Sequence, residues 1–106
     1  MQINKYVVKI TPAAIDDLNA IYEYIASELC NPGAALNLIQ NIEKSVLRLK
    51  VYPRSCSLVK DELLRIKGYR KLIVNNYIAF YICDDINMTV NIMRVLYGRQ
   101  RYENIT

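Results

Sequence analysis

Hydrophobic and polar positions follow three successive patterns along the chain. Residues 5–10 form a short apolar run rich in β-branched side chains, which is typical of a β-strand. Between residues 12 and 49 the apolar positions recur every three or four residues, as they do on one face of an amphipathic helix. Three later runs, over 69–74, 77–83 and 88–96, are again rich in β-branched and aromatic residues. The pattern predicts a strand, a helical region and three strands, in that order.

Two start signals divide the helical region. Thr11 and Asn31 suit the N-cap position, and each precedes a proline that suits the first helical position. The apolar stripe of the first helix is Ile15, Leu18, Tyr22, Ile25 and Leu29, and that of the second is Ala35, Ile39, Ile42, Val46 and Leu49. Pro53 ends the region, and we expect the two closely joined helices to pack as an antiparallel hairpin. The core is expected to hold Leu18, Tyr22, Ile39, Ile42 and Val46.

Turn residues separate the three later strands. The pair Asn75-Asn76 tolerates positive φ and suits a two-residue hairpin turn, and residues 84–87 form a second turn. Asp84 and Asp85 are therefore interpreted as turn residues and not as a catalytic pair. Run 77–83 is apolar on both alternating faces, which predicts a central strand. Residues 53–68 are predicted to be a loop.

These elements predict an α+β fold in one domain, residues 1–106. An N-terminal strand precedes an antiparallel two-helix hairpin and a three-stranded antiparallel meander. The helices are expected to pack on one face of the sheet. The other face is expected to be open to a partner.

Composition limits the chemistry. With 53% hydrophobic residues the chain is globular, and no apolar run approaches the roughly 18 residues that span a bilayer. No signal-peptide pattern opens it, so we expect a cytoplasmic protein without membrane contact. The chain has no histidine, and Cys30, Cys56 and Cys83 show no CxxC spacing. We therefore expect reduced thiols, a buried Cys83, no metal, no cofactor and no histidine-dependent catalysis.

Positive charge is concentrated in the middle of the chain. Residues 48–83 carry eight lysines and arginines against two acidic residues. Such a block attracts polyanions or acidic partners, although it can also be an ordinary solvated surface. Arginine and tyrosine near the C-terminus suit phosphate contact and base stacking, and they equally suit a protein hot spot. Composition leaves these alternatives open.

The segment "GYRKLIVNNYIAFYICDD", followed by "VNIMRVLYGRQRYENI", resembles the RelE/ParE superfamily of bacterial toxins. The resemblance covers essentially the whole chain. It implies the toxin component of a type II toxin–antitoxin module, which arrests growth and is neutralised by a cognate antitoxin. RelE-like members cut mRNA on the ribosome, whereas ParE-like members poison DNA gyrase by a protein–protein contact. Neither mechanism implies a small-molecule substrate.

The resemblance also suggests site residues. A metal-independent nuclease would use Arg70, Lys71, Arg99, Arg101 and Tyr102 as catalytic residues. RelE-like proteins commonly have arginine after the hairpin tyrosine, whereas Ile78 follows Tyr77 here. This departure favours gyrase over ribosome-bound mRNA as the target, and a toxin that is not an enzyme. The further alternative is a non-toxic nucleic-acid-binding domain.

Partner-binding residues follow from the same interpretation, and are Arg65, Lys67, Arg94 and Tyr97. We expect an acidic antitoxin segment to contact Arg65, Lys67, Arg70 and Arg99. Arg94 alternatively pairs with a carboxylate on a neighbouring strand. Core or core-edge packing is expected for six other tyrosines, which are Tyr22, Tyr24, Tyr52, Tyr69, Tyr77 and Tyr81.

Overall fold

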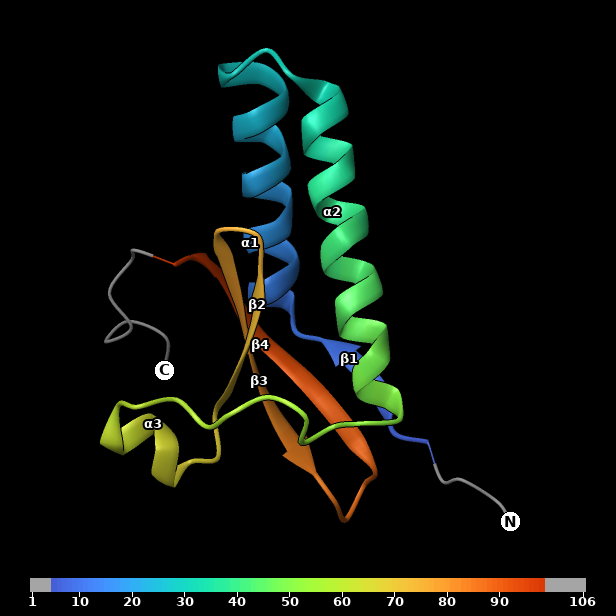
Figure 1. The fold of residues 1–106 in the computed structure, drawn as a ribbon, viewed down its shortest axis with the longest axis vertical. Coiled ribbons are helices and arrows are strands. Elements are labelled where there is room, and N and C mark those ends of the chain that lie inside the picture. The colour runs from blue at the N-terminus through green and yellow to red at the C-terminus, as the bar shows by residue number, and fades with distance from the viewer. Residues whose placement is uncertain (1–4, 99–106) are drawn as a thin grey trace.

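The computed structural model describes residues 5–98, and the predicted α+β order is confirmed (Figure 1). The long elements are β1 (Val7–Ile10), α1 (Pro12–Glu23), α2 (Pro32–Leu47), β2 (Arg70–Val74), β3 (Tyr77–Asp84) and β4 (Thr89–Tyr97). The short elements are the π-helical turn η1 (Tyr24–Glu28), the 3-10 turn η2 (Arg48–Lys50) and α3 (Glu62–Ile66). The strands form one sheet in the order β1-β4-β3-β2, with β1 parallel to β4 and the other pairs antiparallel.

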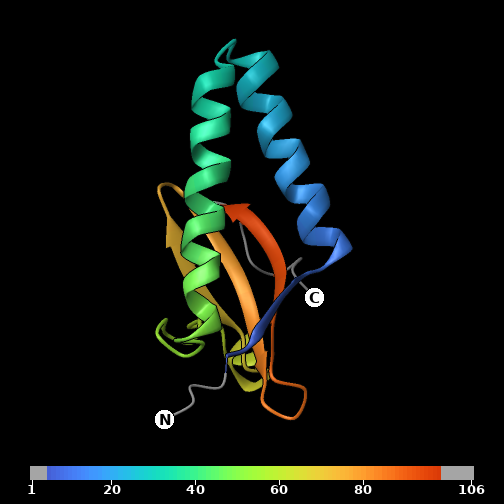
Figure 2. The same ribbon diagram turned by 90° about the vertical axis from the view of Figure 1, so that its right-hand side faces the viewer.

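Capping residues set the helix starts as predicted. The Thr11 hydroxyl accepts a hydrogen bond from the Ala14 N–H, and the Asn31 side chain accepts one from the Ala34 N–H. Cys30, at φ 51°, takes the left-handed conformation that reverses the chain between the helices. The hairpin covers one face of the sheet and extends past its end (Figures 1 and 2).

The helix-covered face holds the larger hydrophobic cluster. It contains Ala14, Leu38, Ile42, Val46, Leu49, Val74, Ala79, Tyr81, Val90, Ile92 and Val95. Alternate residues of β2 and β3 point into this cluster, as the pleat of a sheet requires. The predicted stripe of α2 is confirmed at its buried positions, and Leu38 was missed.

The predicted stripe of the first helix is confirmed at Leu18 and Ile25 and wrong at its other three positions. Ile15, Tyr22 and Leu29 are exposed, whereas Leu18 and Ile21 pack against the cluster. Ala14 is fully buried and carries the side chain that lets α1 approach β4 closely. Tyr24 and Tyr52 are also exposed, in contrast to the expected core-edge packing. The helix therefore turns its small and aliphatic residues inward, and its tyrosines outward.

The second face of the sheet is covered where we expected it to be open. Residues 53–68 contain α3, whose N-cap Asp61 accepts a hydrogen bond from the Leu64 N–H. Leu64 and Val59 pack on the sheet in a smaller cluster with Tyr69, Ile78 and Phe80. A Leu58–Arg70 bridge ties this segment to the outer edge of β2. The loop prediction missed α3 because five residues are too short to show a helical period.

Candidate functional site

Arg70 and Lys71, the predicted catalytic pair of β2, lie on opposite faces of the sheet. Arg70 pairs with Tyr81 in the strand register, on the helix-covered side, and Lys71 pairs with Phe80 on the α3 side. The Arg70 guanidinium Nη1 donates to the carbonyl oxygen of Cys56 at 2.7 Å. Arg70 therefore fastens the segment before α3, and the pair does not converge on one phosphate.

The C-terminal half of the predicted catalytic set is not placed. Arg99, Arg101 and Tyr102 lie outside the described residues. Arg65 and Lys67 are placed, at the exposed end of α3, and neither forms an ion pair within residues 5–98. They lie near the exposed apolar residues Leu63 and Ile66. This end of α3 can contact a partner of negative charge.

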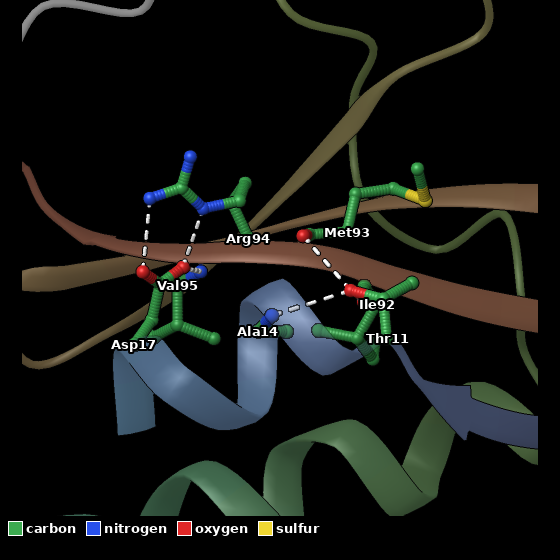
Figure 3. Close-up of polar contacts among 7 residues, drawn as sticks. All are labelled: Thr11, Ala14, Asp17, Ile92, Met93, Arg94 and Val95. Carbon is green, nitrogen blue, oxygen red and sulfur yellow. Dashed lines mark hydrogen bonds and ion pairs between the residues drawn. The ribbon is translucent and has the colours of Figure 1, made fainter. Parts of the chain in front are cut away.

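Arg94 is held by a carboxylate, but on a helix and not on the neighbouring strand (Figure 3). Its Nε and Nη2 donate to Asp17 Oδ2 and Oδ1 at 2.7 and 2.9 Å. The Val95 N–H also donates to Asp17 Oδ2, at 2.9 Å. These bonds favour the charged guanidinium and raise the pKa of Arg94 above its usual value. Asp17 was not recognised from the sequence.

The position of Asp17 follows from where β1 ends. β1 pairs with β4 only as far as Ile92, and α1 then replaces it along the edge of β4. The Thr11 hydroxyl lies 2.9 and 3.0 Å from the carbonyl oxygens of Ile92 and Met93 (Figure 3). Met93 is the extra residue of a β-bulge, since Ile92 pairs with Tyr81 and Arg94 with Phe80. Asp17 and Thr11 together satisfy the strand edge that β1 leaves.

A cleft of about 460 Å³ opens beside this ion pair, between α1 and the last residues of β4. Tyr24, Tyr77 and Tyr97 line it together with Asp17 and Arg94, and we call this the tyrosine cleft. The rings of Tyr77 and Tyr97 lie 5.5 Å apart between centroids. Burial raises the pKa of the Tyr77 hydroxyl, and the neighbouring Tyr97 and Tyr24 raise it further. The structure thus brings together two predicted binding residues, Arg94 and Tyr97.

A second cleft, of about 320 Å³, lies at the β2–β3 turn beside Ile78. Its lining consists of Ile73, Asn75, Asn76, Ile78, Tyr97 and Gly98, so no charged side chain lines it among the described residues. Asn75 has φ 54°, as predicted for this turn. The Gly98 N–H donates to the Asn76 carbonyl oxygen at 2.8 Å, and a Cβ at Gly98 would come within 3.1 Å of that oxygen. Glycine thus lets the end of β4 close against the turn.

A third cleft is an apolar groove between the helices and β1, of about 320 Å³. Val8, Leu18, Ile39 and Val46 are among the residues that line it. Glu43 and Lys50 also line it, and no nucleophile–base pair accompanies them there. The groove can accept apolar side chains, and its lining offers little acid–base chemistry.

Titratable groups also gather at the β3–β4 turn. Asp85 accepts hydrogen bonds from Arg54 Nη2 at 2.7 Å and from the Tyr6 hydroxyl at 2.6 Å. The bond from Arg54, followed by that from Tyr6, lowers the pKa of the Asp85 carboxyl. Asp84 accepts from the Ile86 and Asn87 N–H groups, as a turn residue does. Arg54 and Asp85 are exposed, and this group of side chains serves the turn.

Metal and membrane sites are also not found in residues 5–98. No group of three or more His, Cys, Asp or Glu side chains is placed to hold a metal ion there. No helix in that range has both the length and the apolar character to cross a bilayer. The three cysteines are free thiols. Cys83 is only partly buried, and its thiol donates to the Pro53 carbonyl oxygen at 3.3 Å.

Comparison with known proteins agrees with the fold. A family model described as the ParE toxin of the type II toxin-antitoxin system parDE matches residues 8–102. The chromosomal ParDE toxin–antitoxin system of P. aeruginosa gives a TM-score of 0.72 at 24% identity, over 89% of this chain and 97% of that chain. No curated protein matches the sequence.

Two further solved structures have the same fold. The toxin–antitoxin complex RelBE2 of Mycobacterium tuberculosis gives a TM-score of 0.55 at 24% identity, over 88% of this chain and 98% of that chain. A free-state mutant of the E. coli toxin RelE gives a TM-score of 0.64 at 11% identity, over 90% of this chain and 85% of that chain. At these identities the structures establish the fold alone.

Proposed function

We propose that this chain, which belongs to the ParE toxin family of type II toxin–antitoxin systems, arrests growth by poisoning DNA gyrase through a protein–protein contact. Membership of the family makes it the toxin component of such a system, with a cognate antitoxin as partner. The choice of gyrase over ribosome-bound mRNA is our inference, and it depends on the surface around Ile78.

The cleft beside Ile78 is the observation that supports a non-nuclease, because no charged side chain among residues 5–98 lines it. A ribonuclease without a metal must place cationic or hydrogen-bonding groups at about 3 Å from the phosphoryl oxygens of its transition state. Ile78 occupies the position where a phosphate-binding arginine is expected, and it is buried in the α3-side cluster. Of the predicted catalytic set only Arg70 and Lys71 are described, and Arg70 is engaged by Cys56. The predicted binding residue Arg94 is engaged by Asp17. Lys71 alone is a weak basis for such chemistry.

Ribosome-dependent cleavage of mRNA is the second candidate. The exposed cations Lys60, Arg65 and Lys67 around α3 favour it, since a cluster of positive charge attracts a phosphate backbone. Arg99, Arg101 and Tyr102 would have to supply the remaining catalytic groups. A nucleic-acid-binding domain without toxicity would not explain the family match.

The same cations are the proposed contact for the antitoxin. An acidic antitoxin segment would neutralise Arg65 and Lys67 at the edge of the sheet, with Arg99 as a further contact. Arg70 is less suited than the sequence suggested, because its guanidinium is bonded to Cys56. Reversing Arg65 and Lys67 to glutamate should weaken co-purification with the antitoxin, most strongly at low salt. Unchanged binding would remove this contact from the proposal.

Inhibition of DNA supercoiling tests the function directly. The purified full chain should lower supercoiling by gyrase, and a chain that ends after Gly98 should lose this effect. The matched control is Tyr52→Ala, which changes an exposed residue outside the clefts described above. Undiminished supercoiling at saturating toxin would overturn the gyrase assignment while leaving the family intact.

A further inference from the structure

The tyrosine cleft has the composition of a protein-binding hot spot. Tyrosine and arginine are enriched at the centres of protein interfaces, where a large ring and a multivalent donor make several contacts at once. Here Tyr24, Tyr77, Tyr97 and Arg94 come from α1's π-helical continuation, β3 and β4 and line one cleft. Ile21 and Leu96 add apolar surface to its lining. Only tertiary folding brings these residues together.

Arg94 is fixed in position and still has donors to offer. Nε and Nη2 bond to Asp17, while Nη1 has no hydrogen-bond partner within residues 5–98. In Figure 3 one terminal nitrogen of the guanidinium points away from Asp17. The side chain is 27% exposed, so a ligand can reach it. Since Asp17 already holds the guanidinium, little side-chain entropy remains to be lost on binding.

The rings are partly prearranged as well. Tyr77 and Tyr97 contact each other at a tilted angle of 36°, and Tyr77 is half-buried between its neighbours. Tyr24 is 54% exposed and stands at the rim on the helix side. An entering side chain can therefore cover the exposed face of Tyr24 and rest on the Tyr77 ring. The volume of about 460 Å³ suits one or two side chains and not a whole helix.

We propose that the tyrosine cleft seats the protein target of this toxin, and that it takes an apolar anchor side chain with an adjacent carboxylate. The anchor fills the space between the tyrosines, and the carboxylate accepts hydrogen bonds from the free donors of Arg94. Asp17 is a positioning residue in this contact, because it orients the guanidinium without touching the target. The identity of the target as gyrase rests on the proposed function.

Charge favours a protein over a nucleic acid in this cleft. Asp17 and Arg94 are its only charged lining residues among those described, and their charges cancel. A strand of RNA or DNA needs a positively charged groove along its backbone in addition to stacking rings. A protein anchor with a single carboxylate needs only the donors that Arg94 still presents at Nη1. Exposed cations without an ion pair among residues 5–98, such as Arg65 and Lys67 at α3, lie outside this cleft.

Binding of the full chain to immobilised DNA gyrase tests the inference with matched variants. Tyr24→Ala should weaken binding by about tenfold or more, as loss of a hot-spot residue does. Arg94→Lys should also weaken it, because one ammonium cannot hold Asp17 at two oxygens and serve the target as well. Tyr22→Ala removes another exposed tyrosine of α1 that does not line the cleft, and it should bind as the unchanged chain does. Thermal unfolding of Tyr24→Ala should stay unchanged, which excludes a folding defect.

Three outcomes would overturn the inference in different ways. If the unchanged chain binds and inhibits gyrase but Tyr24→Ala and Arg94→Lys bind equally well, the cleft is not the contact and the proposed function stands. If the unchanged chain neither binds nor inhibits gyrase, the proposed function fails and the assigned occupant fails with it. If a labelled single-stranded RNA binds the chain and Tyr24→Ala abolishes that binding, the cleft stacks bases and does not seat a protein.

Discussion

The two faces of the sheet are covered by very different structures. On one face, the paired helices α1 and α2 close a cluster of eleven buried residues. On the other, the five-residue helix α3 and the segment before it cover a cluster of five. Ile78 belongs to the smaller cluster, at the position where the resemblance would place a phosphate-binding arginine. The second face therefore has a packing role at the very place where catalysis would need charge.

Between the two packed faces, the edge of β4 keeps groups that a partner can reach. The helix side is filled by apolar residues, and the α3 side is covered near Ile78 and Phe80. At the β4 edge, polar and aromatic groups from α1, β3 and β4 remain partly exposed in one cleft. The residues most suited to a partner thus lie between the two packed faces.

The largest expected effect concerns the helix-covered face. Ile42→Ala removes buried methyl groups from the larger cluster and should lower the free energy of unfolding by about 2–5 kcal/mol, near the upper end of that range. Urea unfolding of the full chain measures this. Ile42→Val is the milder control, with an expected loss of about 0.5–1.5 kcal/mol. A loss near zero for alanine would mean that α2 packs through a different side.

Leu64→Ala makes the corresponding change on the α3 face. The expected loss is about 2–3 kcal/mol, because the short segment around α3 can settle into part of the space left behind. Leu63→Ala, beside it but 73% exposed, should stay within about 0.5 kcal/mol of the unchanged chain. If Leu64→Ala and Ile42→Ala lower the free energy of unfolding equally, the two faces contribute equally to stability and the expected difference between them is wrong.

The third expectation concerns the edge between the faces. Asp17→Asn leaves Arg94 without its carboxylate and sets an amide group against the guanidinium, at a cost of about 1.5–3 kcal/mol. Asp16→Asn changes the exposed neighbour and should be nearly neutral. Thermal and urea unfolding of the two variants can be compared directly. If both are neutral, the ion pair does not anchor α1 to β4.

The smallest effect is expected at the exposed pair of Arg54 and Asp85. Because folding lowers the pKa of the Asp85 carboxyl, the pair stabilises the fold above the pKa of the unfolded carboxyl, about 3.9. That contribution is lost as the pH falls through the lowered folded pKa. Asp85→Asn should make the free energy of unfolding depend slightly less on pH. Urea unfolding over about pH 5 to pH 2 measures this. An identical acid profile in the variant would show that solvent screens the pair completely.

Local signals predicted much of the fold. Thr11-Pro12 and Asn31-Pro32 marked both helix starts, and the runs rich in β-branched and aromatic residues marked every strand. The rotation of α1 was missed because Ile15 and Tyr22 fit the helical period as well as Ile21 does. That choice depends on Ala14 meeting β4, which is a tertiary contact.

The site was harder to predict than the fold. Strand alternation alone could have separated Arg70 from Lys71, since neighbours in a strand face opposite sides. The Asp17–Arg94 pair joins residues 77 positions apart, and it depends on β1 ending at Ile10. No local pattern contains that information. The sequence did suggest Arg94 and Tyr97, but not the Tyr24 and Tyr77 rings that complete the cleft.

Cleavage of mRNA on programmed ribosomes is the most direct test of the central claim that this toxin is not a nuclease. The purified full chain is added to ribosomes that hold a defined mRNA, and the 3′ ends are mapped by primer extension. We expect no cleavage at any toxin concentration that inhibits gyrase supercoiling. Ribosome-dependent cleavage within the A-site codon, lost in Lys71→Ala or on truncation after Gly98, would contradict the account.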